Sequence, residues 1–342
     1  MNTSMRFFAR FVNVPTIALF CASCTTNATV SPDGSAASAD TGATVDAGKD
    51  AIAPDAPSFT SDFVPPTGRA TNAQPETPGE FRILTATSTD GVTFTRTNKV
   101  ISDQANVPNV VSTPDGTIYL YYEGSGIESN KDTTAVAIST DGGNNWVYKK
   151  LVISALDKQP TPSDPDITLT ADGTFHAFLT QGIGNLPAIR WATSTNGIDF
   201  TKGGMAFSHD KSPMDSQTFR DTDGTWWMHA LQVKGEALLR AKSTDGQTFS
   251  FVEEVTPRIG NVNYFISCAL REGDTLRLFA FNPGEGVIKT FKYVPPSTLT
   301  AEDGTRLGNG SAPLESSGIK DPAVTKLSNG TYFMAYATKI PL

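Results

Sequence analysis

The sequence predicts an all-β fold, a five-bladed β-propeller with four-stranded antiparallel blades. Two turn motifs alternate along the chain with a period of about 50 residues, the length of one blade. The first is Ser-Thr-Asp-Gly or Ser-Thr-Asn-Gly followed by an aromatic residue, and its copies begin at Ser88, Ser139, Ser194 and Ser243. The second is Asp-Gly-Thr or a near copy, and its glycines are Gly116, Gly173, Gly224, Gly273 and Gly330.

Each repeat contains two hairpins. Asp-Gly and Asn-Gly supply the positive φ angles of the tight turns that join antiparallel strands. Apolar and aromatic residues flank the second motif, as in Ile118–Tyr122 and Phe175–Leu179. Two hairpins make four strands, and five copies of the second motif predict five blades.

The two ends of the predicted domain belong to one blade. The chain enters on strands expected within Phe81–Phe94 and ends on a hairpin expected within Val324–Ala337. We expect the N-terminal strands to complete the last blade, because a ring closed in this way leaves no free sheet edge.

Residues 1–23 predict an export signal, with two arginines ahead of the apolar run Val12–Ala22, which is too short to span a bilayer. Ala22-Ser23-Cys24 has the form of a bacterial lipoprotein cleavage site, at which Cys24 would be acylated. The alternative is an ordinary signal peptide cut near Ala28. The first reading predicts a lipoprotein of the cell envelope or outer membrane, and the second a secreted protein.

Residues 24–78 are rich in alanine, serine, threonine, aspartate, glycine and proline, and poor in bulky apolar residues. Such a segment cannot bury enough surface to offset its chain entropy. We therefore expect a disordered linker, with the propeller occupying residues 79–342. A lipid on Cys24 would hold the propeller at the bacterial membrane.

Composition excludes several classes of function. The net charge is −8 and no basic block occurs, so nucleic acid is not an expected partner. Cys268 is the only cysteine of the predicted domain, and the three histidines form no cluster with cysteine, so no zinc site is predicted. No cofactor is expected. A structural calcium ion in the axial channel stays an open alternative, since carboxylates converge there.

Propeller geometry separates two faces. If the strands of a blade are named A to D from the axis outwards, both turn motifs lie on one face. The aspartates Asp90, Asp141 and Asp245 are therefore expected to have structural roles, bonding local backbone amides while the following aromatic residue packs between sheets. The starts of the A strands and the ends of the B strands lie on the opposite face, where a ligand funnel would open.

Polar side chains gather at this expected mouth. Paired carboxylates around a cleft are what glycoside hydrolysis requires, because one donates a proton to the leaving oxygen and another activates water or attacks the sugar. The alternative is that these acids only cap strands. The candidate catalytic residues are Glu123, Asp164, Asp166, Asp215 and Asp321, and the candidate substrate-binding residues are Asn109, Gln181, Gln232, Asn263 and Tyr264.

Two inner hairpins carry a family resemblance. They are Asp164-Pro165-Asp166-Ile167 ahead of Asp172-Gly173-Thr174-Phe175, and Asp321-Pro322-Ala323-Val324 ahead of Asn329-Gly330-Thr331-Tyr332. The chain resembles the five-bladed propeller glycosidases, the superfamily of arabinanases, β-xylosidases and invertases (glycoside hydrolase family 43 and relatives).

The resemblance implies a carbohydrate partner and three acids, namely an aspartate base, an aspartate that tunes pKa values, and a glutamate acid. Asp164 or Asp166 matches the base and Asp215 the tuning residue. No glutamate matches the acid, because the next blade offers Asn263 and Tyr264.

Three functions follow as alternatives. The first is a secreted or outer-membrane-tethered glycoside hydrolase that acts on a polysaccharide or oligosaccharide. The second is a non-catalytic glycan-binding or scaffold propeller, which the missing glutamate favours. The third is a sialidase-like protein, suggested by the Ser-Thr-Asp-Gly turns (Asp boxes), although sialidases have six blades and an arginine triad.

Overall fold

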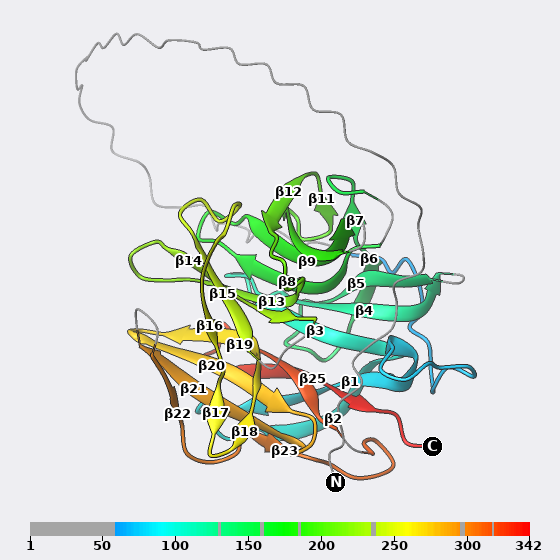
Figure 1. The fold of residues 1–342 in the computed structure, drawn as a ribbon. Coiled ribbons are helices and arrows are strands. Elements are labelled where there is room, and N and C mark those ends of the chain that lie inside the picture. Colours follow the sequence, from blue (N-terminus) through cyan, green and yellow to red (C-terminus); the bar gives the residue numbers. More distant parts are fainter. Residues whose placement is uncertain are drawn as a thin grey trace, which may run out of the picture. The chain divides into compact units, whose positions relative to one another are not determined.

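The computed structural model describes residues 59–128, 131–157, 161–183, 186–233, 237–294, 298–316 and 318–342. These residues confirm the predicted five-bladed propeller of four-stranded antiparallel blades (Figure 1). The predicted signal segment, most of the predicted linker and Cys24 lie outside the described residues. No helix in the described part of the chain is long and apolar enough to cross a bilayer.

The blades follow the chain from the axis outwards. Blade 1 consists of β3 (Ala105–Ser112), β4 (Ile118–Glu128), β5 (Lys131–Ser139) and β6 (Val147–Lys150). Blade 2 consists of β8 (Ser163–Leu169), β9 (Phe175–Ile183), β10 (Leu186–Ser194) and β12 (Lys202–Phe207). Blade 3 consists of β13 (Pro213–Arg220), β14 (Trp226–Gln232), β15 (Leu238–Ser243) and β16 (Ser250–Val255).

Blade 4 contains β19 (Phe265–Glu272), β20 (Thr275–Asn282), β21 (Val287–Val294) and β22 (Thr298–Ala301), and β23 (Leu307–Gly308) also pairs with β21. Blade 5 contains β24 (Lys320–Lys326), β25 (Tyr332–Lys339), β1 (Phe81–Ser88) and β2 (Thr95–Asp103). The minor elements are the 3₁₀ turn η1 (Pro78–Glu80), the parallel pair β7 (Val152–Ile153) and β11 (Asp199–Phe200), and the pair β17 (Arg258–Ile259) and β18 (Val262–Asn263).

The ring closes as the sequence predicts. β1 pairs with β25 in unbroken antiparallel register from Phe81 opposite Lys339 to Ser88 opposite Tyr332. The innermost strands contact one another in the order β3, β8, β13, β19, β24 and back to β3. The first strand of the propeller therefore lies in the middle of the last blade, and no blade is left open.

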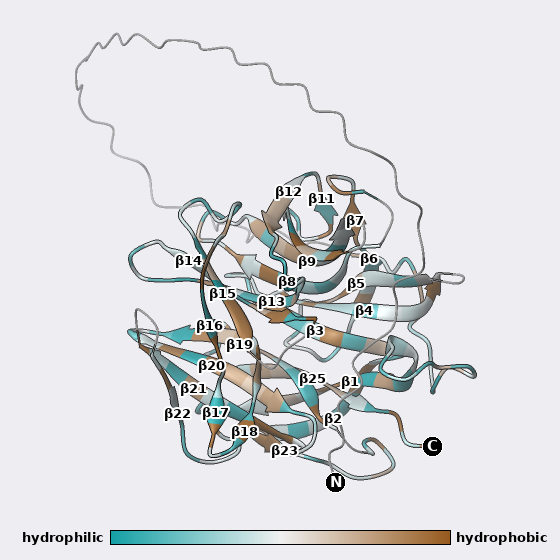
Figure 2. Ribbon diagram, viewed as in Figure 1, coloured by the Kyte–Doolittle hydropathy of each residue, from teal (hydrophilic) through white to brown (hydrophobic). Residues whose placement is uncertain are grey.

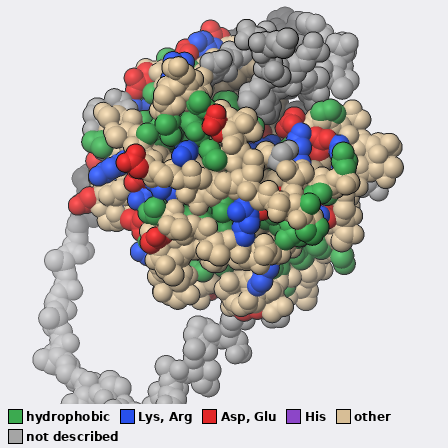
Figure 3. Space-filling view, turned by 90° about the horizontal axis from the view of Figure 1, so that it is seen from below, with side chains coloured by type: hydrophobic (Ala, Val, Ile, Leu, Met, Phe, Trp, Pro, Cys, Tyr) green, Lys and Arg blue, Asp and Glu red, His purple; other side chains and the backbone are tan. Residues whose placement is uncertain are grey.

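Five clusters of buried apolar side chains fill the seams between neighbouring blades in the described chain. Figure 2 shows apolar residues along many strands, with hydrophilic residues in many of the turns. On the face seen in Figure 3, acidic and basic side chains are interspersed among apolar patches.

The aromatic residue after a Ser-Thr-Asp-Gly turn packs across a seam onto the preceding blade. Phe94 contacts Phe279 with ring centroids 6.1 Å apart, and Phe249 contacts Phe178 at 5.5 Å. The Asp90 carboxylate accepts hydrogen bonds from the backbone amides of residues 92 and 93, which lower its pKa. These contacts confirm the structural role expected for the turn aspartates.

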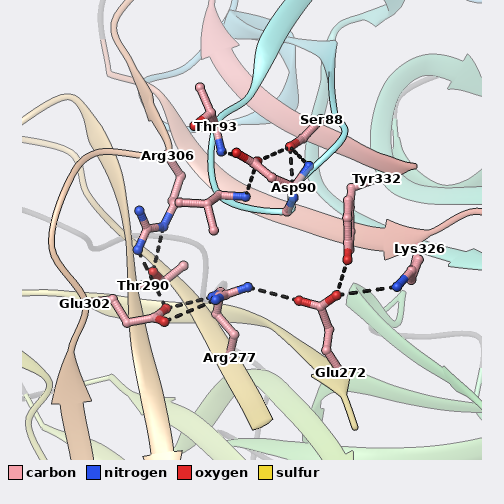
Figure 4. A network of polar contacts seen from close by, with 12 residues as sticks. Ser88, Asp90, Thr93, Glu272, Arg277, Thr290, Glu302, Arg306, Lys326 and Tyr332 are labelled. Atoms are coloured by element: carbon pink, nitrogen blue, oxygen red, sulfur yellow. Dashed lines mark hydrogen bonds and ion pairs between the residues drawn. The ribbon is translucent and has the colours of Figure 1, made fainter. Parts of the chain in front are cut away.

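A polar network joins blades 4 and 5 on the turn face (Figure 4). Glu272, at the end of β19, pairs with Arg277 at 3.1 Å and Lys326 at 3.6 Å, and accepts a hydrogen bond from the hydroxyl of Tyr332. Arg277 also donates two hydrogen bonds to Glu302. The network therefore links both hairpins that meet at this seam.

The segment before β1 packs on the propeller. The Asp62 amide donates to the Tyr148 carbonyl at 2.8 Å, and the ring of Phe63 lies 5.9 Å from that of Tyr148. Phe59 packs on Tyr119 at 6.3 Å. The sequence analysis assigns residues 59–78 to the linker, and these residues include both phenylalanines. The rest of the predicted linker, residues 24–58, contains no aromatic residue.

Candidate functional site

Each innermost strand is interrupted by a bulge at its mouth end. The pairing with the next strand shifts between residues 106 and 109, 163 and 166, 214 and 216, 266 and 268, and 320 and 323. In four of these bulges, among the residues described, a non-glycine residue adopts a left-handed conformation, with φ 47° at Val107, 51° at Asp164, 46° at Asp215 and 49° at Asp321. Bulges re-aim side chains that regular alternation would point elsewhere.

Proline follows the left-handed residue at Asp164-Pro165 and at Asp321-Pro322. Proline has no N–H to donate, so it suits a position where ladder pairing is broken. A non-glycine residue in this conformation costs roughly 1–3 kcal/mol, and such strain clusters at functional sites. Three aspartates held in this way on three different blades therefore mark the mouth as the candidate site.

The pocket at the mouth brings most of the predicted acids together. Asp164 from blade 2, Asp215 from blade 3 and Asp321 from blade 5 line it, and Asn109 and Asp166 also reach it. Leu231, Phe265 and Phe281 contribute apolar side chains from blades 3 and 4. The pocket thus has an acidic part and an apolar part.

Burial raises the pKa of all three mouth aspartates, because water no longer solvates the charged form. The pKa of Asp215 is raised well above its ordinary value by burial and, in addition, by the negative charges of Asp164 and Asp321. Asp164 and Asp215 also interact with each other, so they titrate as a pair. The ammonium of Lys320, 3.4 Å from Oδ2 of Asp321, opposes the rise at Asp321.

Asp166 is buried more deeply. Its exposed fraction is 3%, and neither carboxylate oxygen has a hydrogen bond of regular geometry among the described residues, although the neighbouring Thr218 opposes the rise in the pKa of Asp166. Burial raises the pKa of Asp166 to about 8, so this side chain carries a proton at neutral pH. It is therefore a neutral group in the pocket.

Five of the predicted site residues do not line this pocket in the part of the chain described, namely Glu123, Gln181, Gln232, Asn263 and Tyr264. The amide of Gln181 donates to the Asp157 carbonyl at 2.7 Å, and that of Gln232 to the Ala237 carbonyl at 2.8 Å.

The other three have structural surroundings of their own. Asn263 accepts a hydrogen bond from the Arg258 guanidinium at 2.6 Å, and Tyr264 is buried against Phe291. Glu123 lies opposite Asn106 in the ladder between β3 and β4, with Thr134 as its partner on β5.

Among its described residues, blade 4 presents no carboxylate to the pocket. It contributes Phe265, Ile266, Ser267 and Phe281, and the Ser267 hydroxyl donates to the Pro322 carbonyl at 2.9 Å. The glutamate that the family resemblance implies is therefore missing from the lining as well as from the sequence pattern. The sequence reasoning overlooked Phe265 as pocket wall and Lys320 as the partner of Asp321, although Lys320 directly precedes the Asp-Pro pair.

No group of three or more histidine, cysteine, aspartate or glutamate side chains is arranged to hold a metal ion among the described residues. Calcium in the axial channel stays an untested expectation.

No protein-family model matches the chain, and no curated protein matches it in sequence. Solved structures do match. A putative glycosidase from Bacteroides thetaiotaomicron has a TM-score of 0.54 and 17% identity over 68% of this chain and 86% of that one. A thermostable family-43 glycoside hydrolase has a TM-score of 0.52 and 15% identity over 68% and 88%.

A third structure comes from work on the GH130 family, described as mannoside phosphorylases and as hydrolases that target β-1,2 mannosidic linkages. Its TM-score is 0.50, with 17% identity over 70% of this chain and 87% of that one. The chain has the propeller fold of these glycosidases. At such low identity the likeness establishes the fold, and the chemistry has to be argued from the pocket.

Proposed function

We propose that this propeller hydrolyses glycosidic bonds in a polysaccharide or oligosaccharide, at the pocket lined by Asp164, Asp215 and Asp321. The observation that carries the proposal is the set of three half-buried, interacting aspartates. They project from left-handed bulges of three blades into one pocket, in a fold that solved glycosidases share.

The proposed reaction divides the acids by protonation state. The pKa of Asp215 is raised well above its ordinary value by burial and by the charges of Asp164 and Asp321. Asp215 therefore donates its proton to the glycosidic oxygen while the bond from that oxygen to the anomeric carbon breaks. Asp321 takes a proton from the water that forms the new bond to the anomeric carbon. The negative charge of Asp164 raises the pKa of Asp215 and so keeps Asp215 protonated. One water is consumed, and proton exchange with solvent then restores both acids.

The apolar part of the pocket supports a carbohydrate ligand. A sugar ring presents C–H groups on its faces, and these pack on aromatic and aliphatic side chains while its hydroxyls bond polar groups. Phe265 and Phe281, with ring centroids 5.8 Å apart, line the same pocket as the aspartates.

The decisive test is a screen of aryl glycosides and plant and microbial polysaccharides with the parent chain, Asp215→Asn and Asp321→Asn. We expect each variant to lose roughly 10²–10⁴-fold in rate, the usual contribution of a general acid or base. Asp245→Asn, in a turn on the opposite face, is the matched control and should keep full activity. Equal activity in all four proteins would refute the assignment.

A non-catalytic glycan-binding propeller is the second candidate, because blade 4 offers Phe265 and Ser267 where an acid is implied. It predicts oligosaccharide binding by calorimetry with no turnover of any substrate. The sialidase-like alternative implies six blades, whereas the described chain forms five.

We also propose that the protein is exported and held at the bacterial membrane by a lipid on Cys24, or is otherwise secreted. The support is the sequence pattern of residues 1–24 alone. Labelled palmitate should enter the parent protein and not Cys24→Ser, which should appear in the soluble fraction.

A further inference from the structure

Lys320 is a buried lysine directly beside one of the mouth aspartates. Consecutive side chains of a regular strand point to opposite faces, but the left-handed Asp321 breaks this alternation in β24. As a result, Nζ of Lys320 lies 3.4 Å from Oδ2 of Asp321, and the lysine side chain is only 8% exposed. The same geometry recurs in β8, where Oγ of Ser163 lies 3.3 Å from Oδ2 of Asp164.

The surroundings of Lys320 fix its ammonium in place. The ring of Phe81 lies 4.2 Å from Nζ, a distance at which a cation is attracted to an aromatic face. Oε2 of Glu76 lies 4.0 Å from Nζ on another side. Glu76 also pairs with Lys339 at 2.9 Å, and that second ammonium is 3.7 Å from Glu80.

Glu76 belongs to the segment before β1 and has itself a left-handed backbone, with φ 60°. Its amide donates to Oε2 of Glu80 at 2.9 Å, and this bond holds the turn. The segment that leads into the propeller therefore places a negative charge beside the ammonium of Lys320.

Among the residues described, Lys320 is the only cation in an ion pair with any of the three mouth aspartates. The charged groups that face Asp321 are Lys320, Asp164, Asp215 and, further off, Glu76. Three carboxylates in one buried pocket cannot all ionise at low cost, since like charges oppose one another. A single ammonium beside one of them favours the charged form of that carboxylate.

We propose that Lys320 is a positioning residue for the hydrolysis proposed above: its ammonium holds Asp321 ionised, so that the proton of the pocket stays on Asp164 and Asp215. Glu76 and Phe81 keep that ammonium against Asp321. The catalytic role of Lys320 rests on the proposed function. The distribution of charge among the three aspartates does not, and it can be measured without any substrate.

The test is a ¹³C NMR titration of aspartate carboxyl groups in the parent chain, Lys320→Met and Lys320→Arg, with Asp321→Asn to assign the Asp321 signal. We expect Lys320→Met to move the Asp321 midpoint upward by about one pH unit or more, the effect of removing an adjacent opposite charge. Lys320→Arg should restore the parent midpoint. Lys339→Met is the matched control, because Lys339 contacts Glu76 and Phe81 but no mouth aspartate, and it should leave the midpoint in place.

An unchanged Asp321 midpoint in Lys320→Met would overturn the proposal. If that variant does not fold, an Asp321 midpoint in Lys320→Arg equal to that of the parent supports the proposal, and an upward shift there contradicts it. If a substrate is found, the pH limb of kcat/KM assigned to the base should move with the NMR midpoint, whereas a structural role would lower the rate without moving it. A shifted midpoint in a chain that hydrolyses nothing would refute the proposed function and leave the charge assignment standing.

Discussion

Asp166 provides a quantitative test of how the inner strands are packed. Burial raises the pKa of its carboxyl from 3.8 to about 8, whereas in the unfolded chain it keeps the ordinary value. The folded form therefore holds the proton more tightly than the unfolded form. Its contribution to stability is complete below pH 3.8 and is lost as the pH rises through about 8.

The size of the effect follows from the difference of about four pH units. Each unit corresponds to about 1.4 kcal/mol, so the free energy of unfolding should fall by an amount on the order of 5 kcal/mol between pH 4 and pH 8 because of this one group. Asparagine has nearly the same shape and cannot ionise. If the amide packs as well as the neutral carboxyl, Asp166→Asn should thus unfold with a free energy about 1–2 kcal/mol above that of the parent at pH 5, and about 5 kcal/mol above it at pH 8.5.

The measurement is urea unfolding of both proteins from pH 5 to pH 9, followed by tryptophan fluorescence in the presence of EDTA. The chelator is needed because a bound cation would also lower the pKa of the carboxyl. The buried mouth aspartates add a slope of the same sign to both proteins, so the difference between the two curves isolates Asp166. Two parallel curves would refute the reasoning and would mean that water or another group solvates the carboxylate.

Two further predictions concern the seams. Phe249→Ala should lower the free energy of unfolding by about 3–5 kcal/mol, because it removes a buried ring from the seam between blades 2 and 3. The control is Phe251→Ala, on the exposed edge of blade 3, which should change the free energy of unfolding by less than about 0.5 kcal/mol. Both values are measured by chemical denaturation. Glu272→Gln should cost about 1 kcal/mol at low ionic strength and less in 1 M salt, since it removes the partly exposed ion pairs with Arg277 and Lys326; equal costs at both salt concentrations would argue that the hydrogen bonds, and not the charges, hold that seam.

The fold was predictable because its signals are local and repeated. Each Asp-Gly or Asn-Gly turn fixes a hairpin by backbone geometry, and four such inner turns together with the near copy at Gly273 set the number of blades. Ring closure followed from the same count, since an outer hairpin at the start and an inner hairpin at the end complement each other.

The candidate site was only partly predictable, because bulges decide which side chains enter the pocket. Asp164, Asp215 and Asp321 were found because they begin inner strands. Gln232 was chosen by the same rule at a strand end, yet its amide satisfies a neighbouring backbone carbonyl. Lys320 was missed because regular alternation would place it on the opposite side of the strand from Asp321, and no sequence pattern announces a left-handed residue there.

The pairing of β1 with β25 joins residues about 250 positions apart in the chain. β1 is among the first strands of the propeller to be synthesised, and β25 is the last. Until residue 339 is available, β1 has no inner neighbour, and the seams on both sides of blade 5 cannot form. Contacts of such long range make folding slow and leave strand edges unpaired in the meantime. Loss of β25, a strand of eight residues, would thus remove the middle of a blade. A chain that is still being synthesised cannot reach its final structure before this last strand emerges.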